Sequence, residues 1–241
     1  GDNIFAYVYS CSPKNIIIAS DQVTNEPFLD QVLELPGIVL TVITSDSHPT
    51  TNTTLKKPKY TGKMVHHAIQ GKTDGSGKMH NKFIVIDNTA VITGSPNCTL
   101  SAYNNNIESF VIIINRYVAY LYQAYARYIC SGKDKYDSTQ PEYQHVARML
   151  NFFNASQNTL QVCLAPITNI GNFIPRFFQQ ASILRISMFL VSNNASPPDI
   201  MKELEKTVAS GATVSIKVDK GQFDTMGFVQ KALKPFIATK Q

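Results

Sequence analysis

The chain has 241 residues, of which 44% are hydrophobic and 16% are charged, and its formal net charge is +5. That apolar content excludes a disordered chain, and no apolar run approaches the ~20 residues that a membrane-spanning helix needs. The mild basic excess is compatible with an anionic partner without identifying one. The four cysteines are far apart in the sequence, which indicates isolated thiols rather than a zinc site or a disulfide framework. They are Cys11, Cys98, Cys130 and Cys163.

The first half of the chain alternates between strand-like and helix-like runs. Strands are predicted where apolar residues alternate or form short runs, and helices where they recur every three or four residues. In chain order the expected elements are a strand at 4–9, a strand at 15–19, a helix at 26–35, a strand at 38–44, a loop-rich stretch at 45–78, a hairpin of strands 82–86 and 90–93, a buried strand at 110–114, and a helix whose apolar face carries Val118, Leu121, Tyr122, Tyr125 and Ile129 and which Gly132 ends.

The second half continues the alternation after a polar segment. We expect a connector at 136–158 with a short helix near 143–153, then a strand at 160–164, a helix at 173–181, a strand at 184–191, a helix at 198–210 and a strand at 213–218. Pro198 favours a helix start and Gly211 a helix end. The alternation predicts an α/β sandwich with a largely parallel or mixed sheet.

The sequence also contains a weak internal repeat. Residues 15–46 and 184–219 both read as strand, polar turn, helix, strand and aspartate, with Pro27 and Pro198 near the helix starts. We therefore expect three parts: an α/β half over 1–135, the connector at 136–158, and a partial second copy over 159–241.

The segment from residue 78 to residue 108 carries the chemistry. On a strand, the side chains of His80 and Lys82 project from the same face. A neutral imidazole is a usable nucleophile near pH 7, and a neighbouring ammonium binds phosphate oxygens. Gly94 allows close approach of the backbone, and Ser95 and Asn97 offer hydrogen-bond donors to an anion. The segment therefore predicts a phosphate-binding patch with a nucleophile at its centre.

The spacing of these residues resembles the HKD motif of the phospholipase D superfamily. A glutamate follows at the place where the small endonucleases of that family carry one. The matching residues are His80, Lys82, Asp87, Gly94, Ser95, Asn97 and Glu108. The resemblance implies a phospholipase D-like αβα sandwich with a mixed sheet, one complete motif-bearing half and a partial second copy. It also implies metal-independent cleavage of phosphodiesters through a phosphohistidine.

The resemblance further implies a role for each residue. His80 would attack the phosphorus, and Lys82 and Asn97 would hold the non-bridging oxygens. Ser95 and Glu108 would position the imidazole, and Glu108 would also fix its tautomer.

Asp87 would tie down the turn of the motif. No metal and no cofactor are expected, because lysines would do the charge neutralisation that a cation does elsewhere. The sequence agrees, since no cluster of carboxylates, histidines or cysteines has metal-ligand spacing.

A second histidine is needed as general acid for the leaving oxygen. No second His-x-Lys occurs, because the remaining histidines are followed two residues later by Thr, Ala, Ile and Ala. These histidines are His48, His66, His67 and His145. Three explanations stay open: a homodimer that pairs two copies of His80, a fragment of a longer two-motif enzyme, or an inactive relative.

The loop-rich stretch before the motif is lysine-rich and contains Tyr60. Such a rim would attract a polyanion and stack a base, while a solvated loop is the plain alternative. The residues expected to bind substrate are Lys56, Lys57, Lys59, Lys78, Lys82 and Asn97.

Phosphodiester hydrolysis in nucleic acid, DNA rather than RNA, is the preferred function. A phospholipid phosphodiesterase is the second hypothesis, and it predicts an exposed apolar entrance or an interfacial helix. The third is a non-catalytic module that binds nucleic acid or lipid.

Overall fold

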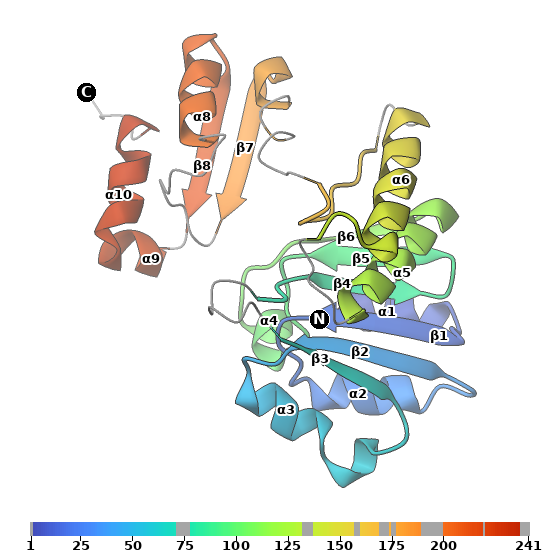
Figure 1. Cartoon of the computed structure of the whole chain (residues 1–241). Helices are drawn as coiled ribbons and strands as arrows, with labels where there is room; N and C mark the ends of the chain where they lie inside the picture. The colour runs from blue at the N-terminus through green and yellow to red at the C-terminus, as the bar shows by residue number, and fades with distance from the viewer. Residues whose placement is uncertain are drawn as a thin grey trace. The chain divides into compact units, whose positions relative to one another are not determined.

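The computed structural model describes residues 2–70, 78–131, 137–156, 160–168, 174, 177–188, 200–218 and 220–236. The chain divides into two compact units, residues 1–162 and residues 163–241. Each unit is described by itself, and Figure 1 shows the elements of both.

A six-stranded mixed sheet organises the first unit. Its order is β3-β2-β1-β4-β5-β6; β1, β2 and β3 run parallel, and β1–β4, β4–β5 and β5–β6 pair antiparallel. The strands are β1 (Asn15–Ser20), β2 (Val39–Ser45), β3 (Val65–Ile69), β4 (Lys82–Ile86), β5 (Ala90–Gly94) and β6 (Phe110–Ile114). The expected mixed α/β fold and its central hairpin are confirmed.

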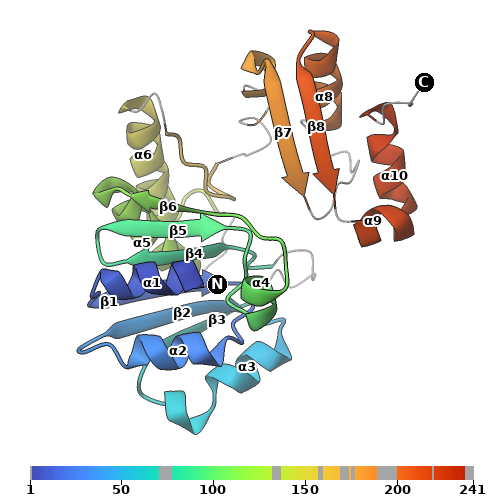
Figure 2. The same cartoon turned by 180° about the vertical axis from the view of Figure 1, so that it is seen from behind.

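Helices cover both faces of this sheet. On one face lie α1 and α2, and on the other lies α5 with α6 packed against it (Figures 1 and 2). The helices of the first unit are α1 (Asp2–Ser10), α2 (Glu26–Leu33), α3 (Pro49–Leu55), the 3-10 turn η1 (Pro58–Tyr60), α4 (Leu100–Asn104), α5 (Arg116–Cys130) and α6 (Pro141–Ser156). The helix expected near residues 143–153 is therefore present and longer than predicted.

The alternation of side chains along β4 explains the two layers. Ile84 and Ile86 are buried in the core that α1 and α2 cover. Phe83 points to the opposite face, where its ring lies 5.0 Å from that of Tyr122 and 6.1 Å from that of Tyr125, both on α5. Alternate side chains of β4 thus pack against apolar residues on opposite faces of the sheet.

The first predicted strand, at residues 4–9, is wrong, because these residues lie in α1. Ile4 and Val8 are four residues apart and both are buried, which is the spacing of one helix face. The run of branched and aromatic residues suggested a strand, but packing on the sheet through a single stripe selects the helix.

The stretch expected to be loop-rich, 45–78, contains α3, η1 and the third parallel strand, β3. β3 escaped prediction because it is an edge strand with exposed and half-buried residues, among them His66 and His67. Residues 71–77 lie outside the described part of the chain.

Two further strand predictions need correction. Residues 160–164 form no strand; the backbone of Val162 instead donates to and accepts from the side chain of Asn154, at 2.8 and 2.9 Å. Residues 110–114 do form β6, but β6 is an edge strand whose Val111 and Ile114 are exposed rather than buried.

The second unit has a parallel two-stranded sheet, β7–β8, with its own apolar cluster. Its elements are β7 (Ile183–Met188), α8 (Ile200–Ala209), β8 (Thr213–Val218), α9 (Lys220–Thr225), α10 (Gly227–Leu233) and the 3-10 turn η2 (Lys234–Phe236). The strand-helix-strand order β7-α8-β8 is parallel, as is β1-α2-β2, but a partial second copy stays a prediction.

Some expectations for this region fall partly outside the described residues. Residues 177–180 are helical within the expected helix 173–181, while the predicted helix start at Pro198 and the end signal at Gly132 are not described. Across the part of the chain that is described, no helix combines the length and the apolar character needed to cross a bilayer. The four cysteines are free thiols.

Candidate active site

The topology gathers the ends of five strands at one edge of the sheet. β1 and β2 end there, β4 and β6 begin there, and β5 ends there, since β4 and β6 run opposite to β1, β2 and β5. Polar residues sit at each of these ends. They are Ser20 at the end of β1 and Asp21 after it, His48 after β2, His80 before β4 and Lys82 at its start, Ser95 and Asn97 after β5, and Glu108 before β6. A crevice at such an edge is the usual place for a ligand in open α/β sheets.

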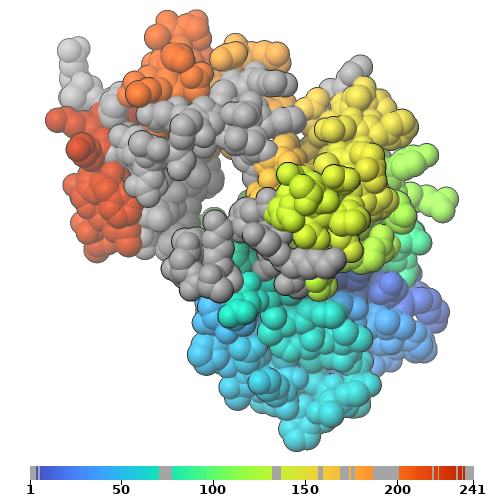
Figure 3. Space-filling view, viewed as in Figure 1, coloured from blue at the N-terminus to red at the C-terminus, as the bar shows by residue number. Residues whose placement is uncertain are grey.

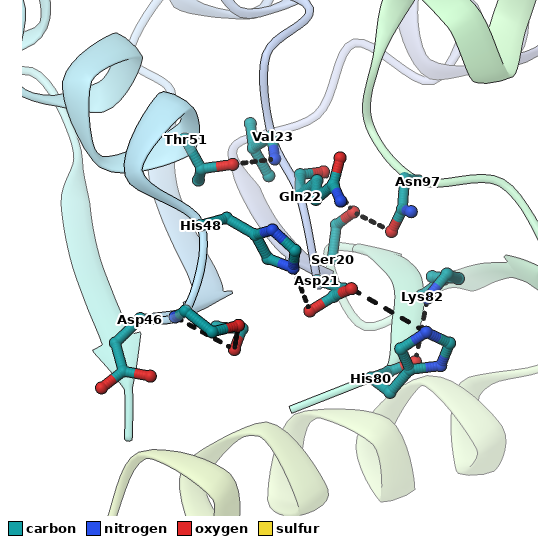
Figure 4. Close-up of polar contacts among 12 residues, drawn as sticks. Ser20, Asp21, Gln22, Val23, Asp46, His48, Thr51, His80, Lys82 and Asn97 are labelled. Carbon is teal, nitrogen blue, oxygen red and sulfur yellow. Dashed lines mark hydrogen bonds and ion pairs between the residues drawn. The ribbon is translucent and has the colours of Figure 1, made fainter. Parts of the chain in front are cut away.

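His80 lies two residues before β4 and faces a buried carboxylate. Its Nε2 is 3.8 Å from Oδ2 of Asp21, whose side chain is 7% exposed, while the side chain of His80 is 71% exposed. The other oxygen of Asp21, Oδ1, lies 3.1 Å from Nε2 of His48. Figure 4 shows the two rings on either side of the Asp21 carboxylate. The side chain of His80 is thus accessible to a substrate and lies next to the carboxylate of Asp21.

Lys82 supplies the positive charge of the site. Its ammonium donates a hydrogen bond to the backbone oxygen of His80 at 3.1 Å. Desolvation lowers the pKa of Lys82, and the charges of Asp21 and Glu108 oppose that shift. The pKa of His80 is also lowered, first by desolvation and then by the charge of Lys82, while Asp21 acts in the opposite sense. A neutral, nucleophilic imidazole beside an ammonium is the consequence at neutral pH.

Ser95 and Glu108 are bound to each other. The hydroxyl of Ser95 donates to Oε2 of Glu108 at 2.5 Å, and Oε1 of Glu108 accepts from the side-chain amide of Asn106 at 3.1 Å. The structure brings both residues to the motif edge, but the carboxylate beside His80 is that of Asp21.

The side chain of Asn97, after β5, lies beside Ser20 at the end of β1. The hydroxyl of Ser20 donates its single proton to the backbone oxygen of Gln22 at 2.7 Å, and Oδ1 of Asn97 lies farther from it, at 3.3 Å. The same hydroxyl accepts from the backbone N–H of Cys98 at 2.9 Å. The side-chain amide of Asn97 offers two N–H donors to an incoming anion.

Asp87 lies at the opposite end of β4, in the turn to β5. Its Oδ1 accepts from the backbone N–H groups of Lys14 and Asn15, at 3.0 and 2.8 Å. Its φ of 47° lies in the left-handed region, which Asp and Asn tolerate better than most residues. The carboxylate therefore fixes the motif turn to the start of β1, away from the other motif residues.

The lysines expected as a substrate rim fall into two groups. Lys57 forms an ion pair with Glu26, and Lys59 pairs with both Glu26 and Asp30 on α2, at 3.0 and 2.7 Å. Figure 3 shows the α3–η1 segment at the surface of the first unit. The charges of Lys57 and Lys59 are thus partly neutralised by α2, whereas Lys78 stands close enough to His80 to lower its pKa.

Lys56 is exposed at the end of α3, and its charge contributes to lowering the pKa of His66 on β3. The cavity beside Lys82 and Gly94 has a volume of about 20 Å³, enough for one water molecule only. Within the described residues, no three His, Cys, Asp or Glu side chains converge as a set of metal ligands.

Sequence reasoning missed Asp21 and His48. Asp21 lies two residues after the end of the predicted strand 15–19, and a polar residue just after a buried strand was the signal that could have found it. In the sequence His48 has only the appearance of a failed His-x-Lys, because Thr50 stands where the lysine would be.

Comparison with protein families gives a match to the model described as "Cardiolipin synthase, PLD-like domain" over residues 6–130. Among curated proteins, the "Mitochondrial cardiolipin hydrolase" of Xenopus tropicalis is 33% identical over 93 residues, which cover 38% of this chain and 42% of the relative. The chain therefore spans less than half the length of that relative.

Two solved structures resemble a larger share of the chain. Polyphosphate kinase from Porphyromonas gingivalis has a TM-score of 0.61 at 11% identity, covering 90% of this chain and 33% of its own. Phosphatidylserine synthase from Haemophilus influenzae has a TM-score of 0.58 at 12% identity, covering 89% of this chain and 59% of its own. At such low identity these likenesses show the fold.

Proposed function

Because the chain belongs to the phospholipase D superfamily of phosphodiesterases and hydrolases, we propose that it cleaves phosphodiesters through a covalent intermediate on His80. One observation carries this proposal: an exposed imidazole lies 3.8 Å from the buried carboxylate of Asp21 and close enough to the ammonium of Lys82 for that charge to lower its pKa. The carboxylate can hold a proton on one ring nitrogen, which leaves the lone pair of the other free to attack.

The reaction has two balanced steps. In the first, the lone pair of His80 forms a bond to phosphorus while the bond from phosphorus to the leaving oxygen breaks, and a general acid protonates that oxygen. In the second, the group that acted as general acid, now deprotonated, takes a proton from water while the water oxygen bonds to phosphorus and the nitrogen–phosphorus bond breaks, which returns His80 to its starting form. Lys82 and the amide of Asn97 would neutralise and hold the non-bridging oxygens in both steps.

The general acid in this proposal is a second His80, supplied by another copy of the chain. A mixing experiment tests this: an excess of inactive His80→Ala chains added to wild type converts most assemblies into mixed dimers with one histidine. The specific activity of the wild-type chains should then fall in proportion. An activity unaffected by the added variant, together with a monomeric mass in solution, would count against the dimer.

Nucleic acid is the substrate class that we propose first. The side chain of His80 is 71% exposed, and the charges of Lys78 and Lys82 are close enough to lower its pKa. An exposed site with flanking cations suits the backbone of an extended polyanion.

Nicking of a supercoiled plasmid in excess EDTA tests the proposal directly. Wild type should nick without added metal, His80→Ala should be inactive, and His145→Ala, which changes an exposed histidine on α6, should be as active as wild type. Acid-labile, base-stable labelling of the protein by a 32P-labelled substrate would report the phosphohistidine. Tight, salt-sensitive binding without product would instead indicate a non-catalytic module.

Hydrolysis of an anionic phospholipid is a second candidate, supported by a specific observation. Leu100 and Ile107, in the segment that joins Asn97 to Glu108, are 47% and 103% exposed. Apolar side chains beside a phosphate site suit contact with a lipid surface. The similarity to a protein named cardiolipin hydrolase points the same way.

Vesicles that contain cardiolipin separate the two candidates. Release of phosphatidic acid by wild type but not by His80→Ala would support the lipid, and Leu100→Ser with Ile107→Ser should then weaken vesicle binding. If the double variant nicks plasmid normally and wild type leaves the vesicles intact, the nucleic-acid function stands.

A further inference from the structure

Asp21 is a buried carboxylate whose ion-pair partners, within the described part of the chain, are two imidazoles. Its Oδ1 faces His48 at 3.1 Å and its Oδ2 faces His80 at 3.8 Å, with its own side chain 7% exposed. A buried charge is costly unless partners compensate it. A buried carboxylate in this position therefore needs a structural or a chemical reason.

Asp87 offers an internal comparison. That carboxylate binds two backbone N–H groups and so holds two parts of the chain together, as a structural aspartate does. Among the described residues, no backbone N–H donates to the carboxylate of Asp21. A carboxylate that faces only rings able to gain and lose protons is better suited to chemistry than to anchoring.

The segments that carry Asp21 and His48 are held firmly to each other. The backbone N–H of Val23 donates to the hydroxyl of Thr51 on α3 at 3.1 Å, and Ser45 donates its N–H to the backbone oxygen of Asp21 at 3.4 Å. His48 precedes Pro49, which restricts its backbone to the extended conformation that it adopts, with φ −113° and ψ 96°. These contacts place the His48 ring on the carboxylate independently of His80.

We propose that Asp21 is the positioning residue of the nucleophile and that His48 holds Asp21 in place, so that His48, Asp21 and His80 form a relay along the sheet edge. This inference rests on the proposed function, which it deepens. The negative charge of Asp21, 3.8 Å from Nε2 of His80, favours the tautomer that carries its proton on Nε2, which keeps the lone pair on Nδ1. When that nitrogen bonds to phosphorus, the ring becomes positively charged, and the carboxylate of Asp21 stabilises it without taking the proton.

Titration of His80 in the substrate-free protein tests the relay without any assay of activity. The groups whose charges act on His80 are Asp21 after β1, His48 after β2, Lys78 before β4 and Lys82 on β4. NMR of ring-labelled histidine should show that Asp21→Asn lowers the pKa of His80 by about one unit, because a negative charge near the ring is lost. Glu108→Gln, which removes a carboxylate bound to Ser95, should leave it unchanged.

His48 supplies a second arm that does not depend on the folding of Asp21→Asn. His48→Ala should raise the pKa of His80, because a competing cation is removed from the carboxylate. If His80 titrates alike in wild type, Asp21→Asn and His48→Ala, or if Glu108→Gln moves it most, the relay is overturned whatever the enzyme's activity.

Kinetics then separate positioning from stability. Asp21→Asn should lower kcat by ~10-fold or more at nearly constant KM, since the carboxylate touches the nucleophile and not the substrate. His48→Ala should also lower kcat, whereas His48→Gln, whose amide N–H can donate to Asp21, should restore much of it. Equal losses in His48→Ala and His48→Gln would reject the role of His48. An inactive wild type that still shows the NMR shifts would reject the proposed function and keep the relay.

Discussion

The backbone oxygen of Ser109 lies 2.2 Å from the point at which a β-carbon on Gly94 would stand. No real β-carbon approaches an oxygen so closely, so a glycine is required where β5 meets β6. The same contact sets the position of Ser95, whose N–H donates to that oxygen of Ser109 at 2.9 Å. Gly94 thus allows β5 and β6 to approach closely at the end of the sheet where the candidate site lies.

Gly94→Ala should destabilise the first unit by about 1–3 kcal/mol or more, because β6 must move to make room. Denaturation with urea, followed together with hydrogen exchange of the β5 and β6 amides, measures the loss. Gly227→Ala is the matched control, since a β-carbon there meets nothing within 4 Å. Equal stability of the two variants would contradict the steric argument.

Asp87→Ala should cost about 1.5–3 kcal/mol of unfolding free energy, because two backbone N–H groups lose a charged acceptor. Asp87→Asn keeps an oxygen acceptor and tolerates the left-handed backbone, so it should cost less. Urea denaturation of both variants is the measurement. A loss as large in the asparagine variant as in the alanine variant would show that hydrogen bonding is not the source of stability.

Lys82→Met should reduce turnover by roughly 10²- to 10³-fold, the usual loss on removing one stabilising donor. It should also move the pH dependence. The pKa of His80 is lowered partly by the charge of Lys82, so its loss raises that pKa. Because protonated His80 cannot attack, the rising limb of the pH–rate profile should shift to higher pH.

Lys82→Arg keeps the charge, and its rising limb should remain where that of wild type lies. If the rising limb of the pH–rate profile does not shift in Lys82→Met, a group other than His80 controls that limb.

Lys78→Gln should weaken binding to a nucleic acid and reduce the slope of log affinity against log salt by about one. Lys59→Gln should change that slope little, because Glu26 and Asp30 already pair with Lys59. Fluorescence anisotropy with a labelled oligonucleotide across a salt series measures both. Equal slopes in the two variants would place Lys59 in the substrate rim after all.

Much of the first unit could be predicted from the sequence, because its signals are local. The alternation in β4 and β5, with Asp87 and Asn88 between them, specifies a hairpin, and the spacing around His80 and Lys82 specifies the motif. Where local patterns were ambiguous, prediction failed. The branched run in α1 looked like a strand until packing through Ile4 and Val8 selected the helix.

Asp21 and His48 show what only the tertiary structure decided. The sequence supplied the proposed nucleophile and its neighbouring ammonium within three residues, since side-chain direction along a strand follows from its period. The partners come from the ends of β1 and β2, far along the chain. They reach His80 only because β1 pairs antiparallel with β4, with Ser20 opposite Lys82, and parallel with β2. Strand pairing is a long-range choice made by the whole core, and no local pattern around His80 contains it.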